Sequence, residues 1–352
     1  MGVPHRVVRP LGLPAGLVWP CRVDPTGRLG PTRGQARGPA WRRSSYGLYV
    51  PADTASSIEQ RIVEAAARLP AYGGLTGWAA LRWMGGVWFD GLDDHGRTER
   101  PVVIATADSS IRSRRGVLVS EERLDPRELT GHRGLTVTSA AHSVFFEMRY
   151  ARGHGEAVRV TDMAAYSDLV SRDEAVAYAA ARPGWTGIGR MREALGDMDE
   201  NAWSPAEVRM RQVWRHDAGL PRPLCNRPVF DLRGNHLGTP DLLDPVVGVV
   251  GEYDGALHLE GAQRARDVHR EGLFRAAGLE YVTMLAADLA DPGAFVTRLL
   301  AAYRRAATRP VADRAWTCEL PPWWIPTFTV AQRRALDDHQ RERLLRLRLR
   351  AG

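Results

Sequence analysis

The feature that most constrains the fold is the order of elements predicted between residues 204 and 307. Ser204-Pro205-Ala206-Glu207 is a capping box with proline at the first helical position, which predicts a helix over 204–217. Strands are predicted at 229–232, 238–244 and 246–254, followed by a helix over 261–277, a strand over 281–285 and a helix over 292–307. This order is typical of an α/β domain in which helices flank a mixed sheet.

Carboxylates occur near the ends of two of these strands. Side chains alternate along an extended strand, so Glu252 and Asp254 are expected on one face. If Asp244-Pro245 closes a hairpin, Asp241 lies diagonally across the ladder from Glu252, with no cationic side chain expected between them. Like charges this close are unfavourable unless a cation neutralises them, and oxygen ligands suit Mg²⁺ or Mn²⁺ better than zinc.

Polar residues after the last of these strands extend the candidate site. His258 comes four residues after Asp254 and is placed to act as a general acid or base beside the metal. Gln263, Asp267 and Arg270 recur at helical spacing, and Arg270 is suited to hold a phosphate group. A cation bound here would activate water and stabilise charge on a phosphodiester.

Each of these residues also has a purely structural interpretation. Glu207 completes a capping box, Asp254-Gly255 suits a hairpin turn, and Asp241 suits a solvated strand edge. His258 alone suits a structural role, and Asp267 with Arg270 suits an intrahelical ion pair. Their combined order and spacing favours the metal-dependent site.

The same residues carry a resemblance to a known family. Residues 204–290 resemble the very-short-patch-repair (Vsr-like) endonucleases, a branch of the PD-(D/E)XK nuclease superfamily. The matching positions are Ser204-Pro205-Ala206-Glu207, Gly219-Leu220-Pro221, Pro240-Asp241, Val249 to Gly255, His258, Gln263, Asp267, Arg270 and Asp288-Leu289.

This resemblance implies a restriction-endonuclease-like domain that hydrolyses phosphodiester bonds in DNA with Mg²⁺ or Mn²⁺. It implies Asp241 and Glu252 as metal ligands, Glu207 as an acid contributed by the first helix and His258 as the catalytic histidine. Asp254 falls where the superfamily carries its lysine, which places water activation on the metal and His258.

The N-terminal region has a fainter resemblance. Trp41 to Val50 predicts a strand with a turn, helices are predicted over 58–69 and 76–84, and this order suits a winged-helix-like module. With Leu75 to Leu81, these segments are similar to AbiEi-type antitoxins and transcriptional regulators. The resemblance implies DNA binding by Arg42 and Arg43 through phosphates, and a toxin or regulatory partner. The alternative is a structural hairpin with a basic arm.

Charge is distributed unevenly along the 352 residues. Every one of the 48 basic residues counted as Lys or Arg is arginine, which excludes Schiff-base and Walker-A lysines. Residues 1–50 carry a net charge of +7 and residues 301–352 of +6, so with a total of +7 the residues between them carry −6. From about residue 330 an arginine-rich helix is predicted, suited either to an anionic partner or to docking on the protein with a solvated arginine face.

These patterns predict four regions: a basic arm and winged-helix-like region (1–100), an α+β region (101–200), the nuclease-like domain (201–310) and a Trp/Pro segment with a basic tail (311–352). Within the α+β region, strands are predicted at 101–106 and 115–120 and helices over 139–150 and 160–182. We expect a cytoplasmic DNA-binding protein with no membrane association. The alternatives are a regulator with a catalytically inactive nuclease fold and a hydrolase of small phosphate esters.

Overall fold

The chain forms two compact units, Met1–Tyr150 and Ala151–Gly352. The computed structural model describes residues 9–93, 96–106, 111–120, 122, 124–255, 261–346 and 348, with the backbone alone for 261–267. Both units are mixed α/β, as predicted. In the part of the chain that the structure describes, no helix is long and apolar enough to span a membrane.

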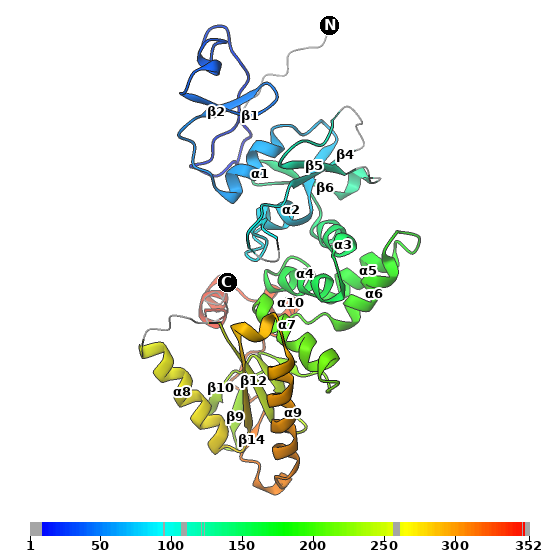
Figure 1. Cartoon of the computed structure of the whole chain (residues 1–352), viewed down its shortest axis with the longest axis vertical. Helices are drawn as coiled ribbons and strands as arrows, with labels where there is room; N and C mark the ends of the chain where they lie inside the picture. Colours follow the sequence, from blue (N-terminus) through cyan, green and yellow to red (C-terminus); the bar gives the residue numbers. More distant parts are fainter. Residues whose placement is uncertain are drawn as a thin grey trace. The chain divides into compact units, whose positions relative to one another are not determined.

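The N-terminal unit is built on a five-stranded mixed sheet (Figure 1). Its strand order is β5 (Val117–Ser120), β4 (Val102–Thr106), β3 (Gly73–Thr76), β7 (Leu135–Thr138) and β6 (Leu129–His132). Three helices, α1 (Ile58–Ala66), α2 (Gly77–Trp83) and α3 (Ala140–Tyr150), accompany it. Because β3 pairs with both β4 and β7, residues before and after position 100 share one sheet.

The predicted hairpin at 41–50 is confirmed as β1 (Trp41–Ser45) and β2 (Leu48–Pro51), which pair antiparallel. The predicted helices over 58–69 and 76–84 are confirmed as α1 and α2. The sequence missed strand β3 between them, because Gly73-Gly74 weakens the strand pattern. This buried strand enters the centre of the sheet, where it pairs on both sides.

The C-terminal unit begins with a helical layer. It contains α4 (His154–Tyr166), α5 (Arg172–Ala180), α6 (Ile188–Asp197), α7 (Pro205–Gln212) and the π-helix η3 (Val213–Asp217). The prediction of one helix over 160–182 is wrong. Asp168 has φ +56°, which ends α4, and Ser171 starts α5 with a capping box to Glu174.

The four-stranded sheet of this unit has the order β13 (Glu280–Leu285), β12 (Val249–Asp254), β11 (Leu242–Asp244) and β8 (Leu224–Cys225). Strands β12 and β13 are parallel and are connected by α8 (Gly261–Ala276), and α9 (Gly293–Ala307) follows β13. A separate three-stranded sheet has the order β10 (His236–Gly238), β9 (Val229–Asp231) and β14 (Trp316–Thr317). In Figure 1, α8 and α9 flank the strands.

Two predicted strands differ from the structure. The strand predicted at 238–244 is divided between β10 and β11, which belong to different sheets. The strand predicted from residue 246 begins at Val249, because Asp244 caps a turn by accepting hydrogen bonds from the N–H groups of Val246 and Val247. The predicted hairpin at Asp244-Pro245 is confirmed by the antiparallel pairing of β11 with β12.

Alternation along β12 assigns its residues to two faces of the sheet. Val250 packs in a buried cluster with Phe274 of α8. Gly251 lies on the opposite face. A Cβ atom added to Gly251 would lie 2.9 Å from the ring of Trp214 in η3. The sheet is therefore packed between α8 on one face and the α7–η3 segment on the other.

The arginine-rich tail docks on the unit's own helices, as one of the two interpretations predicted, but three of its arginines make the docking contacts, whereas a solvated arginine face was predicted. Arg333 of α10 (Val330–Arg334) is fully buried and donates to Asp168, 2.6 Å away. Arg341 of α11 (Asp338–Leu344) donates to the same carboxylate at 2.8 Å, and Arg348 donates to the carbonyl of Tyr166. One helix was predicted here, whereas two short helices form, each with its own capping box.

The β11–β12 turn depends on glycine at position 248, which has φ +81°. A Cβ there would lie 3.1 Å from the ring of Trp316. We expect Gly248→Ala to lower the free energy of unfolding by about 1–2 kcal/mol. Gly272→Ala is the matched control, because nothing lies within 4 Å of its added methyl and it sits on an exposed position of α8. This control is expected to stabilise by about 0.5–1 kcal/mol, as chemical denaturation would measure.

Candidate metal and phosphodiester site

Asp241 and Glu252 adjoin the last residue pair at one end of the β11–β12 ladder. That pair is Leu242 and Gly251, so Asp241 directly precedes β11 and Glu252 is the next residue of β12. The sequence predicted a diagonal placement of the two carboxylates across the ladder. The N–H of Tyr253 donates to Asp241 Oδ2 at 2.7 Å, which directs this carboxylate toward β12.

Glu207 is buried at the start of α7, with 5% of its surface exposed. Ser204 Oγ accepts from the N–H of Glu207, so half of the predicted capping box forms. The Glu207 carboxylate instead accepts from the N–H of Trp203 at 2.7 Å and from Asn226 Nδ2 at 2.6 Å. Burial, followed by the charge of Asp241, raises the pKa of Glu207 to about 8. Burial and the nearby charge of Asp241 therefore both favour the protonated form of Glu207.

An arginine neutralises the other acid, contrary to the prediction that no cation lies among these carboxylates. Arg270 Nη2 of α8 donates to Glu252 Oε2 at 2.8 Å. The physical reason is the alternation of β12: Glu252 shares the face of Val250, and α8 packs on that face. Arg270 therefore pairs with a carboxylate in this structure, although the sequence indicated a phosphate ligand.

The remaining predicted residues are placed as follows. Asp254 is exposed at the end of β12. His258 lies outside the described residues, and Gln263 lies in α8 with its side chain outside them. Their predicted roles stay predictions.

The sequence predicted that Asp241, Glu252 and Asp254 converge at the strand ends. Among the described residues, these three carboxylates are not a set whose ligand atoms all lie within 4.8 Å of one another. Glu207, the acid predicted from the first helix, belongs to α7, which packs on the Gly251 face of the sheet, whereas Glu252 belongs to the opposite face. The pair Asp241 and Glu252 still fits Mg²⁺ or Mn²⁺, since such ions are commonly held by one or two carboxylates and several waters.

The two predicted phosphate ligands of the N-terminal unit differ in their surroundings. Arg42 forms a two-pronged ion pair with Glu64 of α1, at 2.7 and 3.0 Å. Its guanidinium is thus held by a carboxylate of the same unit. Arg43 is exposed, with its guanidinium 5.3 Å from the centre of the Tyr46 ring. Of the two, Arg43 is the more exposed.

A hollow of about 460 Å³ lies between α8, β13 and α9. Three arginines line it, but each is paired with a carboxylate: Arg275 with Glu271 at 2.8 Å, Arg298 with Asp288 at 2.5 Å and Arg305 with Glu280 at 2.8 Å. This pairing leaves little unbalanced positive charge to bind an anion. The hollow is therefore a weaker candidate for a functional site than the ladder end at Asp241 and Glu252.

The structure also reveals a group that the sequence did not indicate, formed by His154, Asp197 and His216. These residues are separated by 43 and 19 positions, so they show none of the short spacings by which metal ligands are recognised in a sequence. One signal was available: His216 belongs to the predicted helix over 204–217, whose end is polar. Its partners could be found only from the packing of the helices.

Asp241 and Glu252 thus lie at one end of the β11–β12 ladder of a mixed sheet, and the buried carboxyl group of Glu207 lies close enough for Asp241 to raise its pKa. No family model, no curated protein and no solved structure matches the chain.

Proposed function

We propose that the C-terminal unit hydrolyses phosphodiester bonds in DNA with Mg²⁺ or Mn²⁺ held by Asp241 and Glu252. The observation that carries this proposal is the position of these two residues, next to the terminal Leu242–Gly251 pair of the β11–β12 ladder. The order of elements supports it: helix α7, a hairpin-linked pair of strands, the crossover helix α8 and a parallel strand β13. This is the order expected of a restriction-endonuclease-like core.

The chain's own residues would divide the work around that cation. Asp241 is oriented by the N–H of Tyr253, and Glu252 by Arg270. The cation, when bound, supplies charge stabilisation for the phosphate and activation of water. Glu207, in its protonated form, adds no negative charge to the site and keeps its proton near Asp241.

Arg270 has two roles in this proposal. In the absence of a cation its guanidinium neutralises Glu252. When a cation takes over that neutralisation, Arg270 becomes available to bind a phosphate oxygen of the DNA, as its place on α8 beside the strand end allows. The proposed N-terminal contribution is DNA binding or regulation through exposed cations such as Arg43.

The test is incubation of the full chain with plasmid, mismatched duplex and RNA, with Mg²⁺, with Mn²⁺ and with EDTA. Metal-dependent cleavage of DNA is expected, and Asp241→Asn is expected to reduce it at least about 1000-fold, equivalent to about 4 kcal/mol. Asp291→Asn is the matched control, because Asp291 is exposed before α9 and far along the chain from the strand end. This control should cleave like the wild type.

The ion pair between Arg270 and Glu252 favours a second candidate function, a DNA-binding regulator with an inactive nuclease fold and a toxin or other partner. Duplex binding that weakens steeply with salt, with no cleavage under either metal, would support this candidate and contradict the first. Hydrolysis of a small phosphate ester without salt-dependent DNA binding would contradict both.

A further inference from the structure

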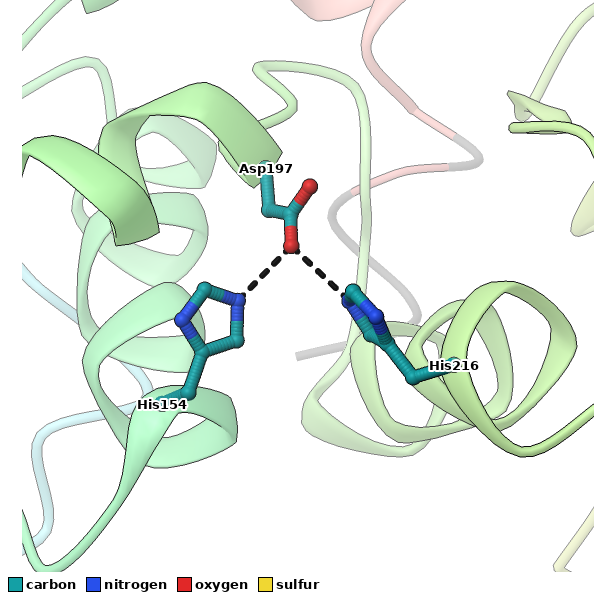
Figure 2. Close-up of side chains that lie close together, drawn as sticks. All are labelled: His154, Asp197 and His216. Carbon is teal, nitrogen blue, oxygen red and sulfur yellow. Dashed lines mark hydrogen bonds and ion pairs between the residues drawn. The ribbon is translucent and has the colours of Figure 1, made fainter. Parts of the chain in front are cut away.

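Three helices of the C-terminal unit bring His154, Asp197 and His216 together (Figure 2). His154 is the first residue of α4, Asp197 is the last residue of α6, and His216 lies in the π-helix η3. Both imidazoles direct Nε2 at one oxygen, Asp197 Oδ2, at 2.7 Å for His154 and 2.9 Å for His216. The two rings are nearly perpendicular, with centres 5.5 Å apart.

Contacts outside this group fix the central carboxylate. Asp197 Oδ1 forms an ion pair with Arg215, which leaves Oδ2 directed toward the two imidazoles. The backbone carbonyl of Asp197 accepts from the buried Arg211 at 2.9 Å, which ties the end of α6 to α7. Carboxylates that ligate metals are commonly held by hydrogen bonds from outer-shell groups, and Arg215 has that position relative to Asp197.

The group is accessible from solvent on the histidine side. The side chains of His154 and His216 are 35% and 48% exposed, whereas that of Asp197 is 10% exposed. A bound ion would therefore have its protein ligands on one side and room for water on the other. The π-helix adds a second unusual feature, because such segments are rare and occur frequently at functional sites.

We propose that His154, Asp197 and His216 form a binding site for a divalent first-row transition metal of the zinc class, completed by water. Two imidazoles and one carboxylate are a ligand set that zinc takes in sites with an open position. Ligands bound to zinc at 2.0–2.1 Å in tetrahedral geometry are about 3.3 Å apart. The present separations of 2.7 and 2.9 Å need to widen only slightly, which half-exposed imidazoles achieve by small side-chain rotations.

The ligands of this site differ in chemistry from those of Asp241 and Glu252. Asp241 and Glu252 offer only oxygen ligands, which Mg²⁺ prefers, whereas imidazole nitrogens favour zinc, cobalt or nickel. The two proposals therefore involve different cations and different residues, and the failure of one leaves the other standing. Without a metal, the same three side chains form a hydrogen-bonded group in which both imidazoles donate to Asp197 Oδ2.

The test uses the full chain stripped of metal with EDTA and dialysed. Titration with Zn²⁺ is followed by calorimetry, and titration with Co²⁺ by its visible absorption spectrum. We expect one site per chain in the wild type, with a Co²⁺ spectrum typical of nitrogen and oxygen ligands. His154→Gln and His216→Gln, made separately, are each expected to weaken binding at least about 100-fold, because even outer-shell changes cost about 10–100-fold.

The control variants distinguish metal binding at this site from metal binding by other histidines or by a thiol. His269→Gln and His339→Gln change exposed histidines on α8 and α11 and are expected to bind like the wild type. Cys318→Ser is expected to do the same. Circular dichroism in EDTA checks that each variant is folded, and Zn²⁺ should raise the melting temperature of the wild type but of neither His154→Gln nor His216→Gln.

Two results would overturn the proposal. One is the absence of a saturable site for Zn²⁺ or Co²⁺ in the folded wild type, which would show the group to be a hydrogen-bonded one only. The other is retention of wild-type affinity in both His154→Gln and His216→Gln, which would place the metal elsewhere on the chain.

Discussion

Arg211→Met is expected to lower the free energy of unfolding of the C-terminal unit by about 3–5 kcal/mol. Arg211 and Asp162 are both completely buried, and Arg211 Nη2 lies 2.6 Å from Asp162 Oδ2. The same guanidinium donates to the carbonyl of Asp197 and to Cys225 Sγ, so it joins α4, α6, α7 and β8. Removal of the cation leaves a carboxyl group in the interior without its counter-charge.

The stability that Arg211→Met removes should depend on pH. Burial raises the pKa of Asp162 to about 6, and Arg211 opposes that rise. Without Arg211 the folded-state pKa rises further above its ordinary value of 3.8, so the folded variant binds a proton that the unfolded chain releases. Stability of the variant therefore falls as pH increases from about 4 upward until the folded-state pKa is passed. Urea denaturation at pH 5 and pH 8 measures this difference.

The matched control combines Arg211→Met with Asp162→Asn. Asparagine keeps the acceptor for the N–H of Asp199, which donates to Asp162 Oδ1 at 2.9 Å, and removes the buried charge. Most of the lost stability should return, because replacement of a whole buried ion pair is often nearly neutral. If Arg211→Met alone lowers the free energy of unfolding by less than about 1 kcal/mol, this ion pair is not essential to the packing of the helices.

Glu207→Gln is expected to stabilise the chain at alkaline pH. The folded-state pKa of Glu207, about 8, is above its ordinary value of 4.5, because burial and Asp241 disfavour the charged form. Between these two values the folded state binds more protons than the unfolded state, so wild-type stability falls as pH rises through this window. Glutamine does not titrate, so the variant lacks this contribution.

The measurement compares urea denaturation of wild type and Glu207→Gln at pH 5 and pH 9, with EDTA present. The stability of the variant relative to the wild type should increase by roughly 4 kcal/mol between these pH values. Glu193→Gln is the matched control on the exposed face of α6, and its effect should stay within about 0.5 kcal/mol at both pH values. An equal pH dependence in wild type and Glu207→Gln would mean that Glu207 is ionised in the folded state.

Local patterns predicted much of the C-terminal unit. The Ser204-Pro205 start of α7, the hairpin at Asp244-Pro245, strand β12 and helices α8 and α9 all follow from capping, turn chemistry and periodicity. These signals involve residues close in sequence, so the local structure that they predict does not depend on tertiary contacts. The break at Asp168 was missed because the apolar pattern continues through it, while a single positive φ ends the helix.

The candidate sites depended more on tertiary structure. The sequence predicted Asp241 and Glu252 as neighbours because one turn connects their strands, and both residues adjoin the terminal Leu242–Gly251 pair of the ladder. It did not predict that Arg270 pairs with Glu252, because that contact depends on which face of the sheet α8 covers. Glu207 was expected to join the two acids, but its helix packs on the opposite face.

The sequence by itself determined the order of elements, the ends of most helices, and the pair of carboxylates on a hairpin, since each depends on interactions within a few residues. Only the tertiary structure decided which charges are neutralised and which side chains converge across helices. His154, Asp197 and His216 show this most clearly, because three helix ends meet through the buried contacts of Arg211 and its neighbours. Nothing in the local pattern around any one of the three residues encodes that meeting.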